Sequence, residues 1–134
     1  MGWNDESVFI FNRTKQTFLA SRAKVADSIL SRLVGLLGRR SLPPDSGLWI
    51  IPSHGVHTWG MLFSIDVVFL DANLKVVSLK EFVRPFSITS LNLSADSVLE
   101  LPAHTIYKSR TTVGDELVIS SYESESMPPG ESPR

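Results

Sequence analysis

The chain has no cysteine among its 134 residues. Disulfides, thiolate nucleophiles and cysteine-ligated zinc or iron–sulfur sites are therefore excluded, because each of them requires the thiol side chain. The same absence leaves open whether the chain works in a reducing or an oxidising compartment.

The sequence also lacks a long hydrophobic run. No apolar stretch approaches the roughly 20 residues that a membrane-spanning helix needs. The first six residues are polar and acidic, unlike a secretory signal. We therefore expect a cytoplasmic chain with no membrane span, although a chain from which an export signal had been cleaved would show the same pattern.

An excess of one charge is missing as well. The 13 Lys and Arg residues and the 14 Asp and Glu residues give a formal net charge of -1. Proteins that bind nucleic acids usually carry a concentrated basic surface, so we expect no nucleic-acid partner. No phosphate-binding loop, dinucleotide glycine pattern, serine elbow or metalloprotease helix motif occurs. We therefore predict no cofactor, and the easily recognised enzyme classes are removed.

What the sequence does contain is enough apolar side chains for one core. Hydrophobic residues make up 43% of the chain and charged residues 20%, which is typical of globular proteins. A chain of this length fits one domain, and we predict a single globular domain over residues 1–122. Residues 123–134 carry too little apolar surface to pack, so we predict a disordered C-terminal tail.

Short apolar runs predict a chain rich in β-strands. Residues 8–11 and 17–20 flank a polar segment and predict a hairpin. Further strands are predicted at residues 48–51, 65–70, 75–79, 98–101 and 117–120. The turn-forming residues at 71–73 and 113–115 each precede one of these strands, and we predict a turn at both places.

One segment has the periodicity of a helix. Over residues 24–37, apolar side chains recur every three or four positions, which predicts one long amphipathic helix. Gly38, followed by Arg39 and Arg40, suits a helix C-terminus. Several strands, one long helix and no regular strand–helix alternation predict an α+β domain with a barrel-like, mainly antiparallel sheet and the helix packed on it.

Asp66 is a charged residue inside an otherwise apolar strand. On a strand, Ile65 and Val67 face one side and Asp66 faces the other together with Val68. Both sides look covered, and an unpaired carboxylate taken out of water costs on the order of several kcal/mol. Asp66 must therefore accept hydrogen bonds from the fold or line a polar pocket. The structural reading is the simpler one: Asp66 accepts hydrogen bonds from the backbone or from His57 and pins the loop before its strand.

Residues near Asp66 suggest a ligand site. Trp59 and Met61 flank a glycine, so two large apolar side chains could close over a small ligand. Arg84, before a proline, could direct its guanidinium at an anion. Core packing and an ordinary strand exit are the competing readings of these residues. The hypothetical ligand site comprises His57, Trp59, Met61, Asp66 and Arg84.

An acid–base pair is the alternative use of the same region. Asp66 with Glu100, or His57 with either carboxyl group, could supply a proton donor and acceptor. Glu100 lies between two leucines and must face opposite to them, toward solvent or a pocket, so it is most simply a surface residue. A zinc or iron site could be assembled from His54, His57 and Asp66, but the spacing is nonspecific and we predict no metal.

Four ordered segments resemble the family known as domain of unknown function 192. They read PSHGVHTWGM at residues 52–61, IDVVFLD at 65–71, VLELPA at 98–103 and VGD at 113–115. The resemblance covers roughly residues 18–119. It implies a compact α+β domain with a strongly curved sheet, found in bacteria and archaea, with no firmly assigned activity. Family members similar to this chain are sometimes encoded beside pilus-assembly genes.

The chain also departs from the family pattern. Relatives usually have glycine where this chain has His104, and those with the His-Thr-aromatic form often have Arg and Pro where it has Leu62 and Ser64. The lost arginine weakens an ion-pair interpretation of Asp66.

Three functions are compatible with these residues. The leading hypothesis is a non-enzymatic ligand-binding or accessory module whose partner is an unknown small molecule or protein. The second is a small hydrolase or lyase that uses Asp66 or His57 as a base. The third is an assembly or interaction protein, including one associated with a pilus. We expect a monomer or a weak homo-oligomer.

Overall fold

The computed structural model describes residues 4–27, 41–55, 62–89 and 91–122. Within these ranges, every predicted strand is confirmed, with small shifts at the ends. The elements are β1 (Asn4–Asn12), β2 (Thr17–Ala26), β3 (Ser46–Ile50), β4 (Ile65–Leu70), β5 (Val76–Val83), β6 (Ser97–Pro102), α2 (Thr105–Ser109) and β7 (Leu117–Ser121). The predicted C-terminal tail lies outside the described residues.

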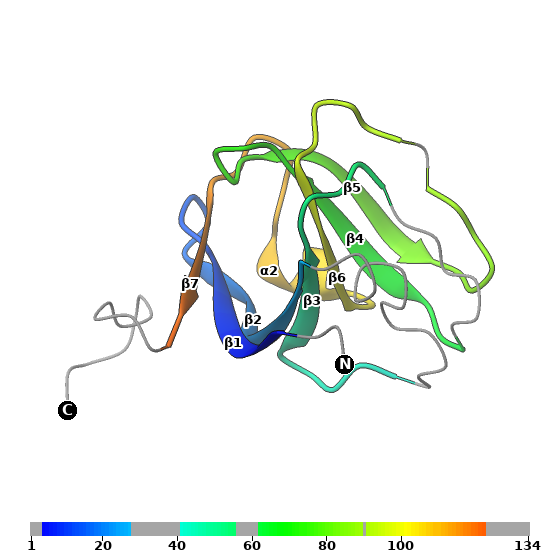
Figure 1. Cartoon of the computed structure of the whole chain (residues 1–134), viewed down its shortest axis with the longest axis horizontal. Helices are drawn as coiled ribbons and strands as arrows, with labels where there is room; N and C mark the ends of the chain where they lie inside the picture. The colour runs from blue at the N-terminus through cyan, green and yellow to red at the C-terminus, as the bar shows by residue number, and fades with distance from the viewer. Residues whose placement is uncertain (1–3, 28–40, 56–61, 90, 123–134) are drawn as a thin grey trace.

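The strands form one sheet with the order β5-β4-β6-β3-β2-β1-β7. Strands β2 and β3 pair in parallel, and all the other neighbours are antiparallel. The sheet curls into a half-barrel, with α2 lying inside the curl (Figure 1). A single domain with a curved, mainly antiparallel sheet is therefore confirmed.

The two edge strands approach each other at one end of the half-barrel. Lys75 and Glu116 form an isolated antiparallel bridge. The Val76 amide donates to the Asp115 carbonyl at 2.8 Å, and the Leu117 amide donates to the Leu74 carbonyl at 2.9 Å. These bonds join the two edges and define what we call the upper rim, because it lies at the top of Figure 1.

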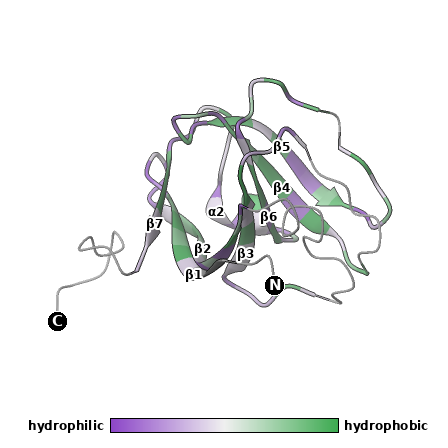
Figure 2. Ribbon diagram, in the orientation of Figure 1, coloured by the Kyte–Doolittle hydropathy of each residue, from purple (hydrophilic) through white to green (hydrophobic). Residues whose placement is uncertain are grey.

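The sheet is apolar on both faces. Strand β4 is buried along its whole length, and its side chains alternate between two clusters. Val68 and Leu70 belong to an inner cluster that also includes Ile106 of α2, whereas Val67 and Phe69 belong to a second, outer cluster. Figure 2 shows the corresponding hydrophobic colouring along β4 and β6. The predicted alternation around Asp66 is confirmed.

The predicted long helix is not confirmed. Its first residues, Lys24, Val25 and Ala26, belong to β2, where they pair in parallel with β3. Val25 and Ala26 are both buried, so this end of the strand is covered on both faces and the local apolar spacing imitates a helix. Residues 28–40 lie outside the described residues. The single helix in the described part of the chain is α2, which has 5 residues.

No helix in the described ranges has the length and the apolar character that crossing a bilayer requires.

Candidate functional site

Asp66 is fully buried and is used by the fold. Its Oδ1 accepts a hydrogen bond from the Phe82 amide and its Oδ2 accepts one from the Ile106 amide, both at 2.9 Å. Phe82 has a positive φ of 54° at an irregular point of the β4–β5 pairing. The carboxylate therefore ties β4 to the irregular end of β5 and to α2. Asp66 accepts backbone hydrogen bonds as the structural reading expected, but these two bonds come from segments after β4 and not from the loop before it.

The bond to Ile106 also stabilises the start of α2. His104 precedes this helix with a φ of 75° and makes no side-chain capping bond. Asp66 supplies the missing acceptor from a distant strand, and a negative charge is favourable at the exposed amides of a helix start. The positive φ of His104 is the conformation that glycine adopts without strain, which agrees with the glycine usual in the resembling family.

Glu100 is buried, so its interpretation as a surface residue was wrong. It is 3% exposed and lies on β6 between Leu48 of β3 and Val67 of β4 in the sheet register. Its Oε2 has no hydrogen-bond partner among the residues that the structure describes. Burial raises the pKa of Glu100 to about 8. The sequence correctly predicted that the Glu100 side chain faces away from the two leucines beside it in the strand. That face of the sheet is covered, however, and not exposed to solvent.

The register separates Asp66 from Glu100. Residues directly opposite each other on neighbouring strands point to the same face. Asp66 is opposite Leu101, which belongs to the inner cluster, and Glu100 is opposite Val67, which belongs to the outer cluster. The two carboxyl groups therefore lie on opposite faces of the sheet. The proposed acid–base pair of Asp66 and Glu100 is not assembled.

The described residues do not assemble the ligand site predicted around Asp66. His57, Trp59 and Met61 lie outside the described residues, so their part of the hypothesis stays a prediction. Asp66 is closed to solvent, and Arg84 is exposed just after β5. Within the described ranges, no group of three or more His, Asp or Glu side chains is arranged to hold a metal ion.

A pocket lies instead at the upper rim, near the opposite end of β4 from Asp66. Asp71 follows Asp66 by five positions, which corresponds to roughly 16 Å along an extended strand. The pocket has a volume of about 500 Å³. We call it the rim pocket, and its lining residues are Ile51, Pro52, His54, Asp71, Ala72, Leu74, Asp96 and Ser97.

Backbone hydrogen bonds hold the walls of the rim pocket together. The Asp96 amide donates to the Leu70 carbonyl at 2.7 Å, and the Ser53 amide donates to the Asp96 carbonyl at 2.9 Å. Asp71 accepts bonds from the amides of Asn73 and Lys75 at 2.9 Å through its Oδ1, which fixes the β4–β5 turn. Three chain segments that are far apart in sequence are thus joined, and the pocket is preformed.

Two polar side chains in the rim pocket are distinctive. The Nδ1 of His54 lies 2.7 Å from the Ala95 carbonyl oxygen. Because a carbonyl only accepts, Nδ1 carries the proton and Nε2 is left as an acceptor in the neutral ring. Ser97 is 1% exposed, and its Oγ has no hydrogen-bond partner in the described part of the chain. His54 had been considered as a metal ligand, whereas Ser97 had not been singled out.

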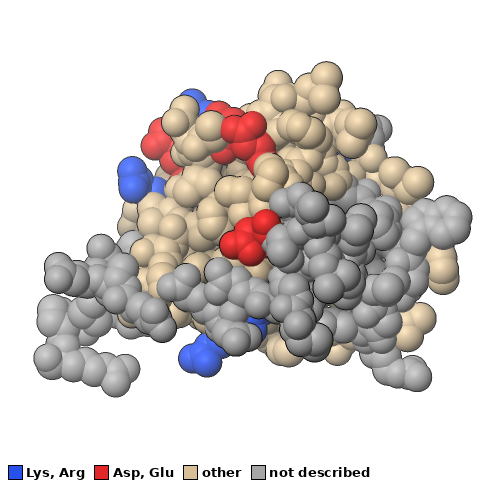
Figure 3. All heavy atoms as spheres, in the orientation of Figure 1, with Lys and Arg blue, Asp and Glu red and all other residues tan. Residues whose placement is uncertain are grey.

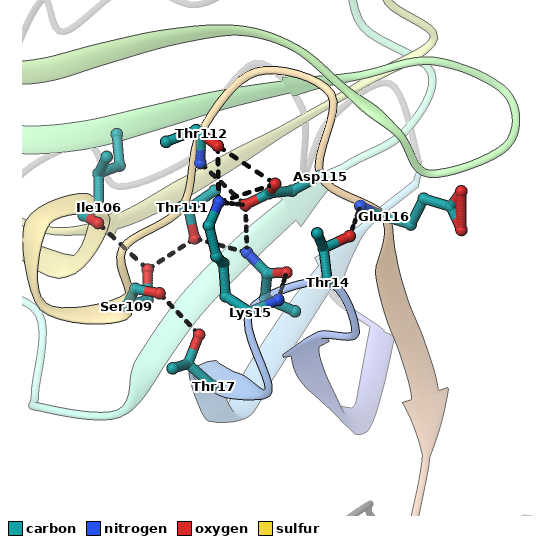
Figure 4. A network of polar contacts seen from close by, with 10 residues as sticks. Thr14, Lys15, Thr17, Ile106, Ser109, Thr111, Thr112, Asp115 and Glu116 are labelled. Atoms are coloured by element: carbon teal, nitrogen blue, oxygen red, sulfur yellow. Dashed lines mark hydrogen bonds and ion pairs between the residues drawn. The ribbon is translucent and has the colours of Figure 1, made fainter.

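A buried polar network at the upper rim was also missed by the sequence interpretation (Figure 4). Asp115 accepts bonds from Asn12 at 2.8 Å, from the Nζ of Lys15 at 2.8 and 2.9 Å, and from the Thr112 amide at 2.9 Å. Burial raises the pKa of Asp115, but the hydrogen bonds from Asn12, Lys15 and Thr112 and the charge of Lys15 lower it further than burial raises it. The network joins the β1–β2 turn to the loop before β7 and is structural.

Comparison with known proteins gives a family match. The model of the family of domain of unknown function 192, described as an uncharacterized ACR, matches residues 10–119. A UPF0127 protein of Thermococcus sibiricus is 33% identical over 116 residues, which are 81% of this chain and 72% of the relative. A UPF0127 protein of Pyrococcus horikoshii is 28% identical over 113 residues, which are 81% of this chain and 96% of the relative.

Two solved structures are similar in fold. A proposed transcription regulator of Sinorhizobium meliloti superposes with a TM-score of 0.73 at 22% identity, over 89% of this chain and 96% of that chain. A protein of unknown function from Novosphingobium aromaticivorans superposes with a TM-score of 0.68 at 16% identity, over 84% of this chain and 83% of that chain. At these identities the likeness shows the fold alone.

Proposed function

This chain belongs to the family of domain of unknown function 192, and we propose that it is a non-enzymatic binding or accessory module whose ligand site is the rim pocket. One observation carries the proposal. The pocket of about 500 Å³ falls within the range of small-molecule sites, which combine an apolar lining with a few convergent polar groups.

The composition of the lining supports binding. Ile51, Pro52 and Leu74 offer apolar surface, while His54 and Asp96 offer hydrogen-bonding groups. The walls are fixed by backbone bonds, so a ligand would lose little affinity to reordering of the protein. Binding is favoured over catalysis because the candidate carboxylates, Asp66 and Glu100, lie on opposite faces of the sheet. A role of His57 in catalysis stays a prediction.

A nuclear magnetic resonance fragment screen tests the proposal. We expect a chemically diverse fragment set to contain members that shift the amide signals of residues 51–54, 71–74 and 96–97. Ala72→Trp fills the pocket and should abolish these shifts. Asn73→Trp places the same bulk in the same turn, but outside the pocket lining, and should preserve them. A screen in which no fragment affects these amides would remove the rim pocket as a ligand site.

A second candidate function is that of an interaction protein, and a separate observation favours it. Between β5 and β6, residues 85–95 contain no charged residue. Four large apolar side chains in this stretch are strongly exposed, namely Phe86 (62%), Ile88 (72%), Leu91 (74%) and Leu93 (81%). Singly exposed apolar residues are ordinary, but a contiguous group marks interaction surfaces.

Light scattering tests this second candidate. Self-association through residues 85–95 predicts a mass above that of the monomer at high concentration, and Leu93→Lys should restore the monomer. A monomeric wild-type chain would leave self-association without support. Association with a pilus stays a prediction from the family resemblance. The regulator description of the Sinorhizobium meliloti protein suggests nucleic acid, but a net charge of -1 opposes such a partner.

A further inference from the structure

We propose that the rim pocket binds a small organic cation, with a primary ammonium or amidinium group on a compact apolar body. This inference rests on the proposed function, because it names the ligand class of the same pocket. It is carried by the charge of the lining, by the direction of its hydrogen-bonding groups and by one buried hydroxyl without a partner.

The charge of the lining favours a cation. Asp71 and Asp96 both line the pocket, and none of the lining residues is Lys or Arg. In the space-filling view, acidic side chains lie at the upper left of the molecule, on the side of the β4–β5 turn, and basic side chains lie beside them (Figure 3). Two carboxylates beside a recess with apolar walls attract a positive charge more strongly than they would in open water.

The hydrogen-bonding groups of the lining are mainly acceptors. The Asp96 carboxylate only accepts, and Asp71 uses its Oδ1 for the turn amides, so its second oxygen is the one left for a ligand. His54 donates its Nδ1 proton to the Ala95 carbonyl, which leaves Nε2 as an acceptor in the neutral ring. A ligand that satisfies these groups must donate several hydrogen bonds. An ammonium group has three donors and no acceptor, and an amidinium group likewise only donates.

Ser97 provides the independent observation. It lies opposite Leu70 in the register and therefore faces the inner side of the sheet, where the pocket-lining residues Ile51 and Leu74 pack against the inner cluster. Its Oγ is buried without a partner in the described ranges. A buried hydroxyl without a hydrogen bond is unfavourable in the free protein, and a donor on a bound ligand would relieve that cost.

The apolar residues of the lining determine which uncharged part of a ligand fits the pocket. Ile51, Pro52 and Leu74 form an apolar wall, which suits a short ring or aliphatic body rather than an extended polyol. A metal cation fits less well, because the described residues hold no group of three or more suitable side chains. The pocket thus selects an organic cation with one donor-rich end and one apolar end.

Three probes of similar shape and different charge test the inference. Benzylammonium chloride, benzyl alcohol and sodium benzoate are titrated separately into the full chain, and the amides of the pocket are followed by nuclear magnetic resonance. We expect benzylammonium to bind at least about 10-fold more tightly than benzyl alcohol, and benzoate not to bind. The preference should weaken as salt is added, because salt screens the carboxylates.

Variants assign the selectivity to the pocket. Asp96→Asn keeps the backbone bonds of this residue, removes one charge and should weaken benzylammonium binding about 3- to 10-fold. Asp45→Asn removes a charge from an exposed turn outside the pocket lining and should leave binding unchanged. Ser97→Ala should weaken binding about 3-fold without lowering the thermal stability of the free chain, which separates a ligand contact from a structural role.

The outcomes distinguish the two proposals. If benzyl alcohol or benzoate binds in the pocket as tightly as benzylammonium, or if only uncharged fragments bind there, the cation inference is overturned while the binding function stands. If no probe and no fragment shifts the pocket amides, both are overturned. Selective binding of benzylammonium that is insensitive to both Asp96→Asn and Asp71→Asn would also overturn the inference, because the charge would then act outside the pocket.

Discussion

Asp115 and Glu100 are both 3% exposed, but Glu100 lies in the middle of the sheet between β3 and β4, whereas Asp115 lies in the loop before β7, and their hydrogen-bond partners differ. Asp115 accepts bonds from Asn12, Lys15 and Thr112, whereas the Oε2 of Glu100 accepts none from the described residues. The pKa of Asp115 is lowered, and that of Glu100 is raised to about 8. At neutral pH one carboxyl group is therefore ionised and the other protonated. The depth of burial and the hydrogen-bond partners together decide the charge of a carboxyl group that solvent hardly reaches.

The two groups make stability depend on pH in opposite ways. The lowered pKa of Asp115 means that its contribution is present above its ordinary pKa of 3.8 and is lost as pH falls through the folded value. The folded chain keeps the Glu100 proton up to a pKa of about 8, whereas the unfolded chain releases it near 4.5. Stability therefore falls between these values as pH rises, because the folded state binds more protons.

The largest expected effect comes from deleting the satisfied carboxylate. Asp115→Ala should lower the free energy of unfolding by about 3–5 kcal/mol, because Asn12 and Lys15 lose their shared partner in a buried site. Urea denaturation at pH 7 measures this change. Asp115→Asn keeps the shape and part of the bonding and should cost clearly less. Equal losses for both variants would show that the network acts by packing alone.

The unsatisfied carboxyl group should respond to pH. Relative to wild type, Glu100→Gln should gain roughly 1.4 kcal/mol of stability per pH unit, or about 3 kcal/mol from pH 5 to pH 7. Denaturation curves at several pH values measure the difference. Glu81→Gln changes an exposed glutamate of β5 and should show no such slope. If the stability difference between Glu100→Gln and wild type did not change with pH, Glu100 would not be a buried, protonated group.

Asp66 is an intermediate case, because its partners are backbone amides and not side chains. Asp66→Asn should cost about 2 kcal/mol, since the new amide group must place a donor against the amide of Phe82 or Ile106. Hydrogen exchange at these two amides should speed up with the loss. Asp71→Asn, in a turn that asparagine tolerates, is the matched control and should change stability little. Unchanged exchange at Ile106 would contradict the capping role.

The smallest expected effect concerns Lys15, whose side chain is 30% exposed. Lys15→Met should cost about 1 kcal/mol, because solvent screens part of its attraction to Asp115. It should also bring the pKa of Asp115 closer to its ordinary value, which a carboxyl titration by nuclear magnetic resonance measures. An unaltered Asp115 titration would assign the lowered pKa to Asn12 and Thr112 instead.

The sequence interpretation succeeded where the information is local. Short apolar runs predicted the strands, and the turn at residues 71–73 was predicted from residues that favour turns. It failed at residues 24–26, because pairing with β3 overrode a helical spacing. For Glu100, the two-residue period correctly predicted the direction of the side chain. The period does not reveal whether the face that the side chain meets is covered.

The rim pocket could not be predicted in the same way. Its walls come from the segment after β3, the β4–β5 turn and the start of β6, and only the sheet order brings these together. No short motif links His54 to Ser97. For the same reason, the backbone partners of Asp66 at Phe82 and Ile106 are 16 and 40 residues away and leave no pattern near Asp66 itself.

The amino-acid sequence by itself determined the strands, most turns and the family, because each depends on residues close together in the chain. The tertiary structure decided which face of each strand is covered, which carboxyl groups gain partners and where the pocket lies. Those properties depend on contacts between distant segments, whose electrostatic and solvation energies exist only once the sheet has closed.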